Sequence, residues 1–317
     1  MSNILIEARC DPNCRPILDA LATACGNLGH EVWRWRGPLS GRVSYSRRLG
    51  HCDLAILFNG AHHSYKKSLS QLRRRGAKLL FVELGWHPQL GTFQLDPQGI
   101  NAAASWVDQP LVATACRKLP TRPGADLLVI LQHDRDTQIT DHSPWFADMV
   151  EFISHLCQHS QLPLRVRAHP RHPPSDRLIR LIEDRGFQLD SCQSLSQALQ
   201  QCRAVACINS SAAVEALAAR VPVMCYGRAI YRHAGAVYCL DDRGDCTRRV
   251  TAAIAAGESE LYPESIDEVL RRIAGQQWRL EQIPARLPPV LTALLKADPA
   301  SAAHRGWRWP FVLRNAG

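Results

Sequence analysis

The chain has 317 residues, and its 38 Lys+Arg against 29 Asp+Glu give a formal net charge of +9 at pH 7. At ~150 residues per domain, this length predicts about two domains. Because 46% of the residues are hydrophobic and only 21% are charged, the composition argues against an intrinsically disordered protein. The longest apolar runs, such as 127–131, are far shorter than the ~20 residues that a membrane-spanning helix needs.

Strands and helices alternate along the first part of the chain. The predicted strands are 4–7, 31–35, 54–58 and 78–82, and the predicted helices are 16–27 and 69–75. Apolar strands separated by helices are typical of a parallel sheet covered on both faces. Pro120, Pro123 and Gly124 then indicate a domain boundary, so we predict an N-terminal Rossmann-like domain over 1–122.

The alternation restarts after this boundary. The predicted strands are 127–131, 164–168, 204–208 and 222–226, and the predicted helices are 145–159, 176–185, 195–203, 212–219, 247–256 and 266–273. This pattern predicts a C-terminal Rossmann-like domain over 123–275. Two doubly wound α/β domains in tandem would face a central cleft at the C-terminal ends of their sheets.

Residues 276–317 differ in character from both domains. Pro284, Pro288 and Pro289 interrupt the pattern of strands and helices, and Arg and Trp interleave between Arg305 and Phe311. We expect this tail to pack back over the first domain. The alternative is contact with lipid headgroups, where a lipid-linked acceptor would be presented.

The cysteines and the basic residues indicate neither a metal site nor nucleic-acid binding. Of twelve cysteines, Cys10 and Cys14 form a C-x-x-x-C pair without a third ligand at metal-site spacing, so reduced thiols are expected. The basic residues are scattered and fit solvated helix faces, with attraction to acidic substrates or an anionic membrane as the alternative. The start of the chain lacks the features of a signal peptide, which predicts a cytoplasmic protein.

A carboxylate follows the predicted strand 78–82. Gly85 and Gly99 permit tight turns around Glu83, so its side chain is expected to project from the strand end into the cleft, with Asn101 in the same cluster. A loop carboxylate paired with a nearby Arg is the alternative.

Two carboxylates follow the predicted strand 127–131. After Gln132, Asp134 and Asp136 resemble the D-x-D pattern that holds a metal and a diphosphate sugar. The pattern is common, and a solvated turn before a helix is the alternative.

A histidine follows the predicted strand 164–168. Pro170 favours an extended conformation for His169, which would aim the imidazole out of the strand end beside Arg167. As His⁺ or as an N–H donor, the ring would bind a phosphate oxygen. The alternative is an ordinary polar residue at a strand end.

Two serines open the helix that follows the predicted strand 204–208. Asn209, Ser210 and Ser211 precede the helix, and Glu215 lies one turn further on the same face. Hydroxyls and backbone N–H groups at a helix start can bind an anion, while Glu215 would accept hydrogen bonds from ribose. Plain N-capping is the alternative.

In order and spacing, the four clusters resemble the bacterial capsule polysaccharide biosynthesis family, whose characterised members are retaining β-Kdo glycosyltransferases that use CMP-Kdo. The resemblance spans about residues 83 to 240. Its motifs are Glu83-x-Gly-Trp, Gly99-x-Asn101, Gln132-x-x-x-Asp136-x-Gln-Ile to Ser143, His169-Pro170, Asn209-Ser210-Ser211-x-x-x-Glu215-Ala-Leu and Pro222-Val223-x-x-x-Gly227-x-x-x-Tyr231. It implies a GT-B arrangement of the two Rossmann-like domains.

The resemblance also implies roles for individual residues. Asp136 matches the catalytic aspartate, and Glu83 matches an acidic position that would serve as acid/base for the acceptor. The implied nucleotide-binding residues are His169, Pro170, Asn209, Ser210, Ser211 and Glu215. The implied substrate-binding residues are Gln132, Asp134, Arg167, Asn101 and Tyr231.

The implied reaction is transfer of Kdo from CMP-Kdo to a capsule or lipid-linked glycan acceptor, with retention through a glycosyl–enzyme adduct on Asp136. Arg167, His169 and helix starts would neutralise the monophosphate donor, so neither a metal nor a cofactor is expected. The alternatives are a transferase of the same fold for another nucleotide sugar and a non-catalytic glycan-assembly protein. The chain would act in the cytoplasm, with the inner face of the inner membrane as a further site.

Overall fold

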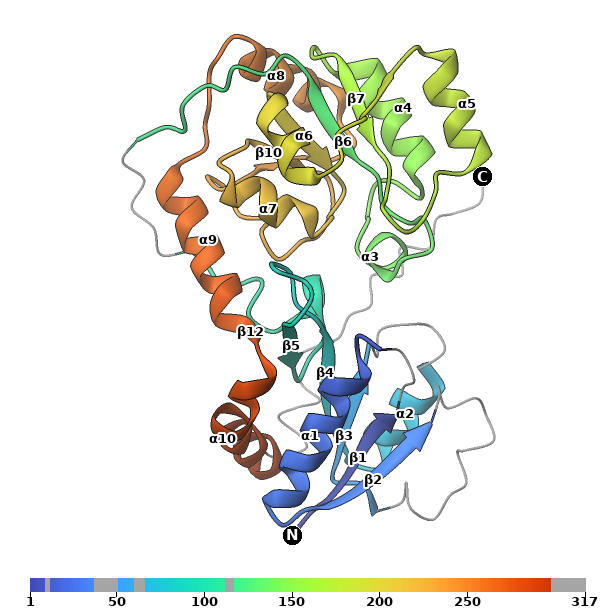
Figure 1. The fold of residues 1–317 in the computed structure, drawn as a ribbon, viewed down its shortest axis with the longest axis vertical. Helices are drawn as coiled ribbons and strands as arrows, with labels where there is room; N and C mark the ends of the chain where they lie inside the picture. The colour runs from blue at the N-terminus through green and yellow to red at the C-terminus, as the bar shows by residue number, and fades with distance from the viewer. Residues whose placement is uncertain (9–11, 37–50, 60–65, 112–116, 298–317) are drawn as a thin grey trace. The chain divides into compact units, whose positions relative to one another are not determined.

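The computed structural model describes residues 1–8, 12–36, 51–59, 66–111 and 117–297. The chain forms two compact units, drawn in Figure 1. Unit 1 holds Met1–Val82 and the chain from Leu280 onward, and unit 2 holds Glu83–Arg279. The division falls within strand β4.

Unit 1 contains a parallel sheet in which β1 pairs with β2 and β3, and β3 pairs with β4. Its elements are β1 (Asn3–Ala8), α1 (Arg15–Asn27), β2 (Glu31–Arg36), β3 (Leu54–Phe58), α2 (Lys66–Arg74) and β4 (Lys78–Leu84). All of β3 and the middle of β1 and β4 are buried, which explains why their sequences are continuously apolar. The predicted parallel sheet is therefore confirmed.

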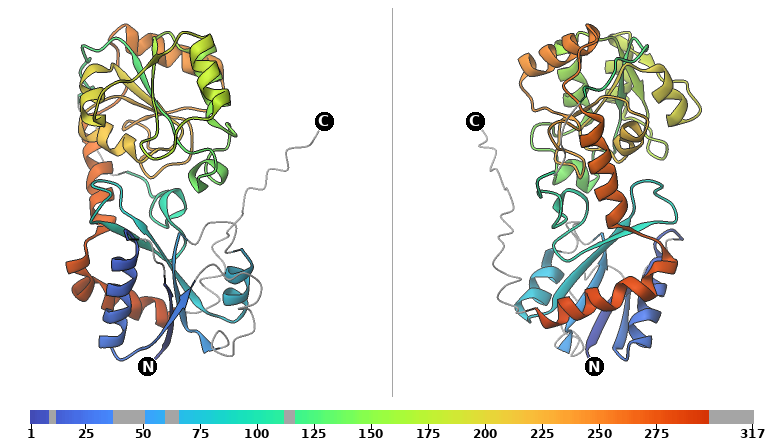
Figure 2. Two further views of the ribbon diagram at one scale, coloured as in Figure 1. Left: turned by 45° about the vertical axis from the view of Figure 1, so that its right-hand side comes forward. Right: turned by 90° about the vertical axis from the view of Figure 1, so that its left-hand side faces the viewer.

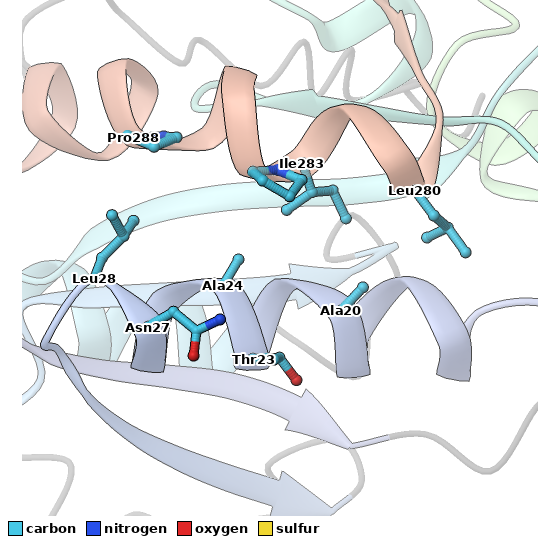
Figure 3. A pocket seen from close by; sticks show the side chains of 9 residues that line it. Ala20, Thr23, Ala24, Asn27, Leu28, Leu280, Ile283 and Pro288 are labelled. Atoms are coloured by element: carbon cyan, nitrogen blue, oxygen red, sulfur yellow. The ribbon is translucent and has the colours of Figure 1, made fainter.

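Helix α10 (Ile283–Lys296) lies beside α1 in unit 1, after the short η5 (Leu280–Gln282), as Figure 3 shows. A groove of about 350 Å³ runs between the two helices. No helix was predicted over this range, where the prolines interrupt the sequence pattern, yet Pro288 and Pro289 both lie inside α10. Leu287 and Leu291 are buried, and this packing holds the helix together where backbone N–H groups are missing.

A six-stranded parallel sheet forms the centre of unit 2, in the order β11-β10-β9-β6-β7-β8. Its strands are β6 (Leu127–Ile130), β7 (Leu164–Arg167), β8 (Gln188–Leu189), β9 (Ala204–Cys207), β10 (Val223–Cys225) and β11 (Tyr238–Cys239). By chain position this order is 3-2-1-4-5-6, the Rossmann arrangement. The strand order reverses between β6 and β9, and ligands of such folds bind at this point, beyond the carboxyl ends of the strands.

Helices lie on both sides of this sheet, as Figure 2 shows. They are α3 (Thr137–Thr140), α4 (Met149–His159), α5 (Asp176–Asp184), α6 (Leu195–Gln201), α7 (Ala212–Ala218), α8 (Gly244–Ala255) and α9 (Pro263–Gln276). Helix α4 begins later than the predicted Trp145, because the Asp148 carboxylate accepts from the Glu151 N–H and caps it there. Among the described ranges, the model contains no helix whose length and hydropathy would let it span a bilayer.

The segment from Glu83 onward belongs to unit 2, although the predicted boundary lies at 122. Unit 2 also contains β5 (Phe93–Asp96), η4 (Asn101–Ala103) and β12 (Gln277–Trp278), which pairs antiparallel with β5. The indoles of Trp86 and Trp106 meet edge to face at 5.6 Å and join the apolar cluster that contains β6. The division into compact units at Glu83 therefore differs from the division by sheets, because β5 and β12 belong to the sheet order β12-β5-β4-β3-β1-β2 and the central sheet of unit 2 starts at Leu127. The Arg/Trp-rich stretch 305–311 lies outside the described residues.

Candidate active site

A pair of amide side chains joins the two strand ends at which the sheet order reverses. Gln132 follows β6 and Asn209 follows β9, and each donates a hydrogen bond to the other. The Gln132 Nε2 lies 2.8 Å from the Asn209 Oδ1, and the Asn209 backbone N lies 3.0 Å from the Gln132 Oε1. The Asn209 amide also donates to the backbone carbonyls of Gln138 and His142 at 2.7 and 3.3 Å. Asn209 therefore fixes the loop after β9 against the loop after β6.

Asp136 lies in the loop after β6, where its side chain caps α3. The Asp136 Oδ1 accepts from the Gln138 N–H at 2.8 Å, and the side chain is exposed. Asp134 is less exposed and its Oδ1 accepts from the Met149 N–H at 2.8 Å, so it holds the start of α4. Of the two carboxylates, Asp136 is the one open to a ligand.

His169 lies beyond the end of β7, and its Nδ1 accepts from the Arg171 N–H at 3.2 Å. Desolvation, followed by the charges of His172 and Arg171, lowers the pKa of His169, while Asp136 opposes the shift. At neutral pH the ring is therefore uncharged with its proton on Nε2, which makes Nε2 a hydrogen-bond donor. Of the two expected forms, the structure favours the neutral donor over His⁺. Pro170 is exposed beside it.

His169 begins a row of three histidine rings, and the sequence analysis did not identify the other two. His172 lies 4.9 Å from His169 and 4.3 Å from His133 between ring centroids. His133 comes from the loop after β6, so this stack joins the ends of β6 and β7. The only sequence signal was the number of histidines near these strand ends.

The guanidinium of Arg167 is committed to an internal ion pair. Arg167 binds the Asp190 carboxylate, whose side chain is fully buried, and donates to the Cys192 carbonyl at 3.0 Å. Arg165 binds the same carboxylate at 2.6 Å. Burial alone would raise the pKa of Asp190, but hydrogen bonds from Arg167 and Cys192 bring it below its ordinary value. Arg167 was expected to neutralise the anionic sugar donor, but its charge is already compensated by Asp190 inside the protein.

A buried tyrosine holds the loop 209–211, called the serine loop below, from the side of the protein core. Tyr231 is 1% exposed, and its hydroxyl donates to the Ser210 carbonyl at 2.8 Å. The Ser210 hydroxyl accepts from the Ala212 N–H at 3.3 Å, whereas Ser211 is exposed and makes no side-chain cap bond. Tyr231 therefore positions the loop from inside the core, although it was expected to bind substrate. Ser211 retains a hydroxyl for a ligand.

Glu215 is partly exposed in the first turn of α7. Among the described residues, its carboxylate has no hydrogen bond or ion pair. Its acceptor capacity is thus available next to the serine loop, as expected for a ribose contact.

Glu83 and Asn101 lie at the start of unit 2. Glu83 is partly buried, and its Oε1 accepts from the Leu84 N–H at 2.9 Å. The Asn101 Oδ1 accepts from the Trp86 indole at 2.8 Å and from the Gln94 amide at 2.9 Å. The Asn101 amide oxygen thus holds this loop together, and the expected contact of Asn101 with substrate stays a prediction.

His142 and Gly227 pack against the loops that follow β6 and β9. His142 is 9% exposed, its Nδ1 has no partner among the described residues, and desolvation with the Arg228 charge lowers its pKa to about 4. A Cβ on Gly227 would lie 2.7 Å from the Ile208 side chain and 3.0 Å from the His142 carbonyl oxygen. Gly227 is thus required for close packing, which explains its place in the motif.

The described residues hold no group of three His, Cys, Asp or Glu side chains arranged to hold a metal ion. Both carboxylates of the D-x-D pattern accept backbone hydrogen bonds. The ten described cysteines are free thiols, and Cys10 lies outside the described residues.

Comparison with known proteins places these motifs in a family. Residues 87–273 match the model of the family described as capsule polysaccharide biosynthesis protein. Protein FixF of Sinorhizobium fredii (strain NBRC 101917 / NGR234) is 27% identical over 274 residues, which are 76% of this chain and 63% of FixF. The chain thus spans less than two thirds of that relative.

Solved structures of Thermosulfurimonas dismutans KpsC are similar in fold. The beta Kdo 2,7 transferase is 15% identical with a TM-score of 0.55, covering 92% of this chain and 99% of that one. The beta Kdo 2,4 transferase is 12% identical with a TM-score of 0.49, covering 92% and 98%. The fold is a GT-B-like α/β fold with two largely parallel sheets. Because the family model covers more than half of its residues, the chain belongs to the capsule polysaccharide biosynthesis protein family.

Proposed function

We propose that the protein is a retaining glycosyltransferase that transfers Kdo from CMP-Kdo to a surface-glycan acceptor. The observation that carries the proposal is the Gln132–Asn209 pair, which holds the Asp136 loop and the serine loop together where the sheet order reverses. The family match and the fold shared with the beta Kdo 2,7 transferase support the same activity.

Asp136 is the proposed nucleophile. One of its oxygens accepts from the Gln138 N–H, so the other is left to attack the anomeric carbon. As the new C–O bond forms, the bond from the anomeric carbon to the phosphate oxygen breaks and CMP leaves with both electrons. An acceptor hydroxyl then displaces Asp136 and gives its proton to a base, for which Glu83 is the candidate. Two displacements restore the configuration of the donor.

The leaving phosphate is proposed to lie between His169 and the serine loop. The Nε2–H of a neutral His169 and the Ser211 hydroxyl supply hydrogen bonds that strengthen as charge develops on the phosphate oxygen. The Glu215 carboxylate accepts from the ribose hydroxyls. Because CMP carries a single phosphate, the proposed reaction uses no bridging metal.

The Asp136→Asn variant tests the nucleophile. Asn keeps the shape and an oxygen acceptor for Gln138, so the loop and CMP affinity should persist while Kdo transfer is lost. The matched control is Asp148→Asn, in which Asn keeps the cap on α4. Intact-protein mass spectrometry after incubation with CMP-Kdo should detect a Kdo adduct on the wild type and none on Asp136→Asn. Full turnover by Asp136→Asn would refute the covalent route.

Binding of CMP is tested separately. CMP should raise the melting temperature of the chain more than UDP does, and His169→Ala should weaken CMP binding by about tenfold because it removes a hydrogen bond to a charged phosphate. Equal protection by UDP would point to a transferase for another nucleotide sugar. If neither nucleotide bound, the chain would be a non-catalytic member of its family.

A further inference from the structure

A basic pocket of about 260 Å³ lies in unit 2, apart from the residues that the family motifs assign to the nucleotide. One wall is the segment 228–233 and the other is the loop 102–110. The pocket is lined by Arg228, Arg232 and His233 against a single acid, Asp108.

The positive charge of this basic pocket is poorly compensated. The Arg228 side chain is 47% exposed and approaches Asp108 only to 3.9 Å, while the Asp108 side chain is 89% exposed. Solvent and salt screen such a pair strongly. Arg272 lies behind the loop wall, where it donates to the Gln109 and Pro110 carbonyls at 2.6 and 2.8 Å and lies 3.9 Å from the Glu268 carboxylate. The same bonds fix the loop wall in place.

Two buried nitrogens of the pocket residues lack partners. The Arg232 Nε and the His233 Nε2 are shielded from solvent and make no hydrogen bond within the described part of the chain. Arg232 is itself held firmly, since it donates to the Leu240 carbonyl at 2.9 Å and lies 5.3 Å from the Trp145 ring centroid. Buried polar atoms in native proteins usually have partners, so these residues keep hydrogen-bonding capacity that the described part of the chain does not use.

His142 connects the basic pocket to the candidate active site. Its carbonyl accepts from the Arg228 N–H at 2.9 Å and from the Asn209 amide at 3.3 Å. Its imidazole experiences the charges of both Arg228 and Asp136. A charge of the basic pocket and the charge of the proposed nucleophile therefore both act on the same buried ring.

We propose that the basic pocket binds the carboxylate of a sugar acid, with Arg228 as its main cationic contact. The identity of this ligand rests on the proposed Kdo transfer, because a Kdo unit carries a carboxylate in addition to the phosphate of CMP and so calls for a second anion contact. Arg167 does not supply this contact, since it is paired with Asp190. An Arg fork matches a carboxylate with two parallel hydrogen bonds.

Sulfate serves as the probe for the pocket, because its binding does not depend on the sugar. Calorimetry measures sulfate affinity of the full chain with CMP in excess, so that the proposed phosphate position is filled. Arg228→Gln should weaken sulfate binding at least tenfold, and Asp108→Asn should strengthen it several-fold by removing the opposing acid. The matched control is Arg180→Gln on the exposed surface of α5, which should leave sulfate affinity unchanged. Equal sulfate affinity in Arg228→Gln and the wild type would overturn the proposal.

The carboxylate has two sources, the donor and the end of an acceptor glycan. If it belongs to the donor, Arg228→Gln should weaken CMP-Kdo binding while leaving CMP binding unchanged. If it belongs to the acceptor, the same variant should weaken binding of free Kdo in the presence of CMP and leave CMP-Kdo unaffected. An unchanged affinity for both would overturn the sugar-acid assignment. Failure of the wild type to bind CMP would refute the proposed function, and sulfate titration without CMP would still test the basic pocket.

Discussion

Replacing Asn209 with Asp tests whether the Gln132–Asn209 pair holds the two loops of the candidate site together. The substitution keeps the shape of the side chain and lets its oxygen still accept from Gln132. It removes both donated hydrogen bonds, to the carbonyls of Gln138 and His142, and places a carboxylate against these two oxygens. The variant therefore removes hydrogen bonds between the loops after β6 and β9 without creating a cavity.

The magnitude follows from these two bonds and the burial of the site. Asn209 is 5% exposed, so water cannot replace the lost partners. Each of the two buried hydrogen bonds contributes about 1 kcal/mol, and the Gln138 carbonyl, left without its amide donor, costs a further 1–3 kcal/mol, roughly, whereas the His142 carbonyl keeps the Arg228 N–H. We therefore expect about 3–5 kcal/mol of destabilisation. For a folded unit of this size, about 2–4 °C is lost per kcal/mol, so the melting temperature should fall by roughly 10 °C.

Differential scanning calorimetry and CMP titration measure the two consequences. CMP affinity should fall together with the melting temperature, because the serine loop and the Asp136 loop lose their shared support. Gln188→Glu is the control, since it makes the same amide-to-acid change at an exposed residue of the same sheet and should shift stability by less than about 0.5 kcal/mol. A melting temperature of Asn209→Asp within 2 °C of the wild type would refute the reasoning.

Three further predictions concern the packing at Gly227, the pKa of two buried histidines and the exposed hydroxyl of Ser211. Gly227→Ala should destabilise by about 1–3 kcal/mol in urea unfolding because its Cβ meets packed atoms, whereas Gly26→Ala, whose Cβ meets nothing within 4 Å, should not destabilise. Burial, with nearby charges, lowers the pKa of His142 and His155 to about 4, so below pH 6.5 the unfolded chain binds protons that the folded chain does not. Stability measured by urea titration should therefore fall between pH 6.5 and 4 by up to about 1.4 kcal/mol per pH unit for each ring, and a flat profile would contradict their neutral burial. Ser211→Ala should weaken CMP binding in calorimetry with no change in melting temperature, because Ser211 makes no cap bond.

The strands were predictable because their physical signal is local. The strand β3 is buried over its whole length and was predicted with its observed bounds, since five apolar residues in a row indicate a strand covered on both faces. The two-residue strands β8 and β12 carry no comparable signal, because so few residues show no periodicity. Helix α10 was missed for the opposite reason. Its prolines indicated a break locally, but burial of Leu287 and Leu291 outweighs them.

The sequence predicted where the residues of the candidate site lie, but not which partners each side chain has. Strand ends and motif spacing identified Asp136 and His169, which interact electrostatically in the structure. The sequence does not show that Arg167 is paired with Asp190, 23 residues away, or that Tyr231 reaches under Ser210. Such pairs depend on tertiary packing, which a pattern in a single sequence does not encode.

Hydrogen-bond capacity divides the motif residues into two groups. Gln132, Asn209 and Tyr231 use their polar atoms on each other and on backbone groups, and Asn209 and Tyr231 are buried. Ser211 and Glu215 are at least partly exposed and keep acceptors or donors that no described residue uses. The first group can affect a ligand only through the shape of the loops, so its variants must lose stability and affinity together. The second group can be changed with little effect on stability, and loss of affinity alone then identifies direct contact with the nucleotide.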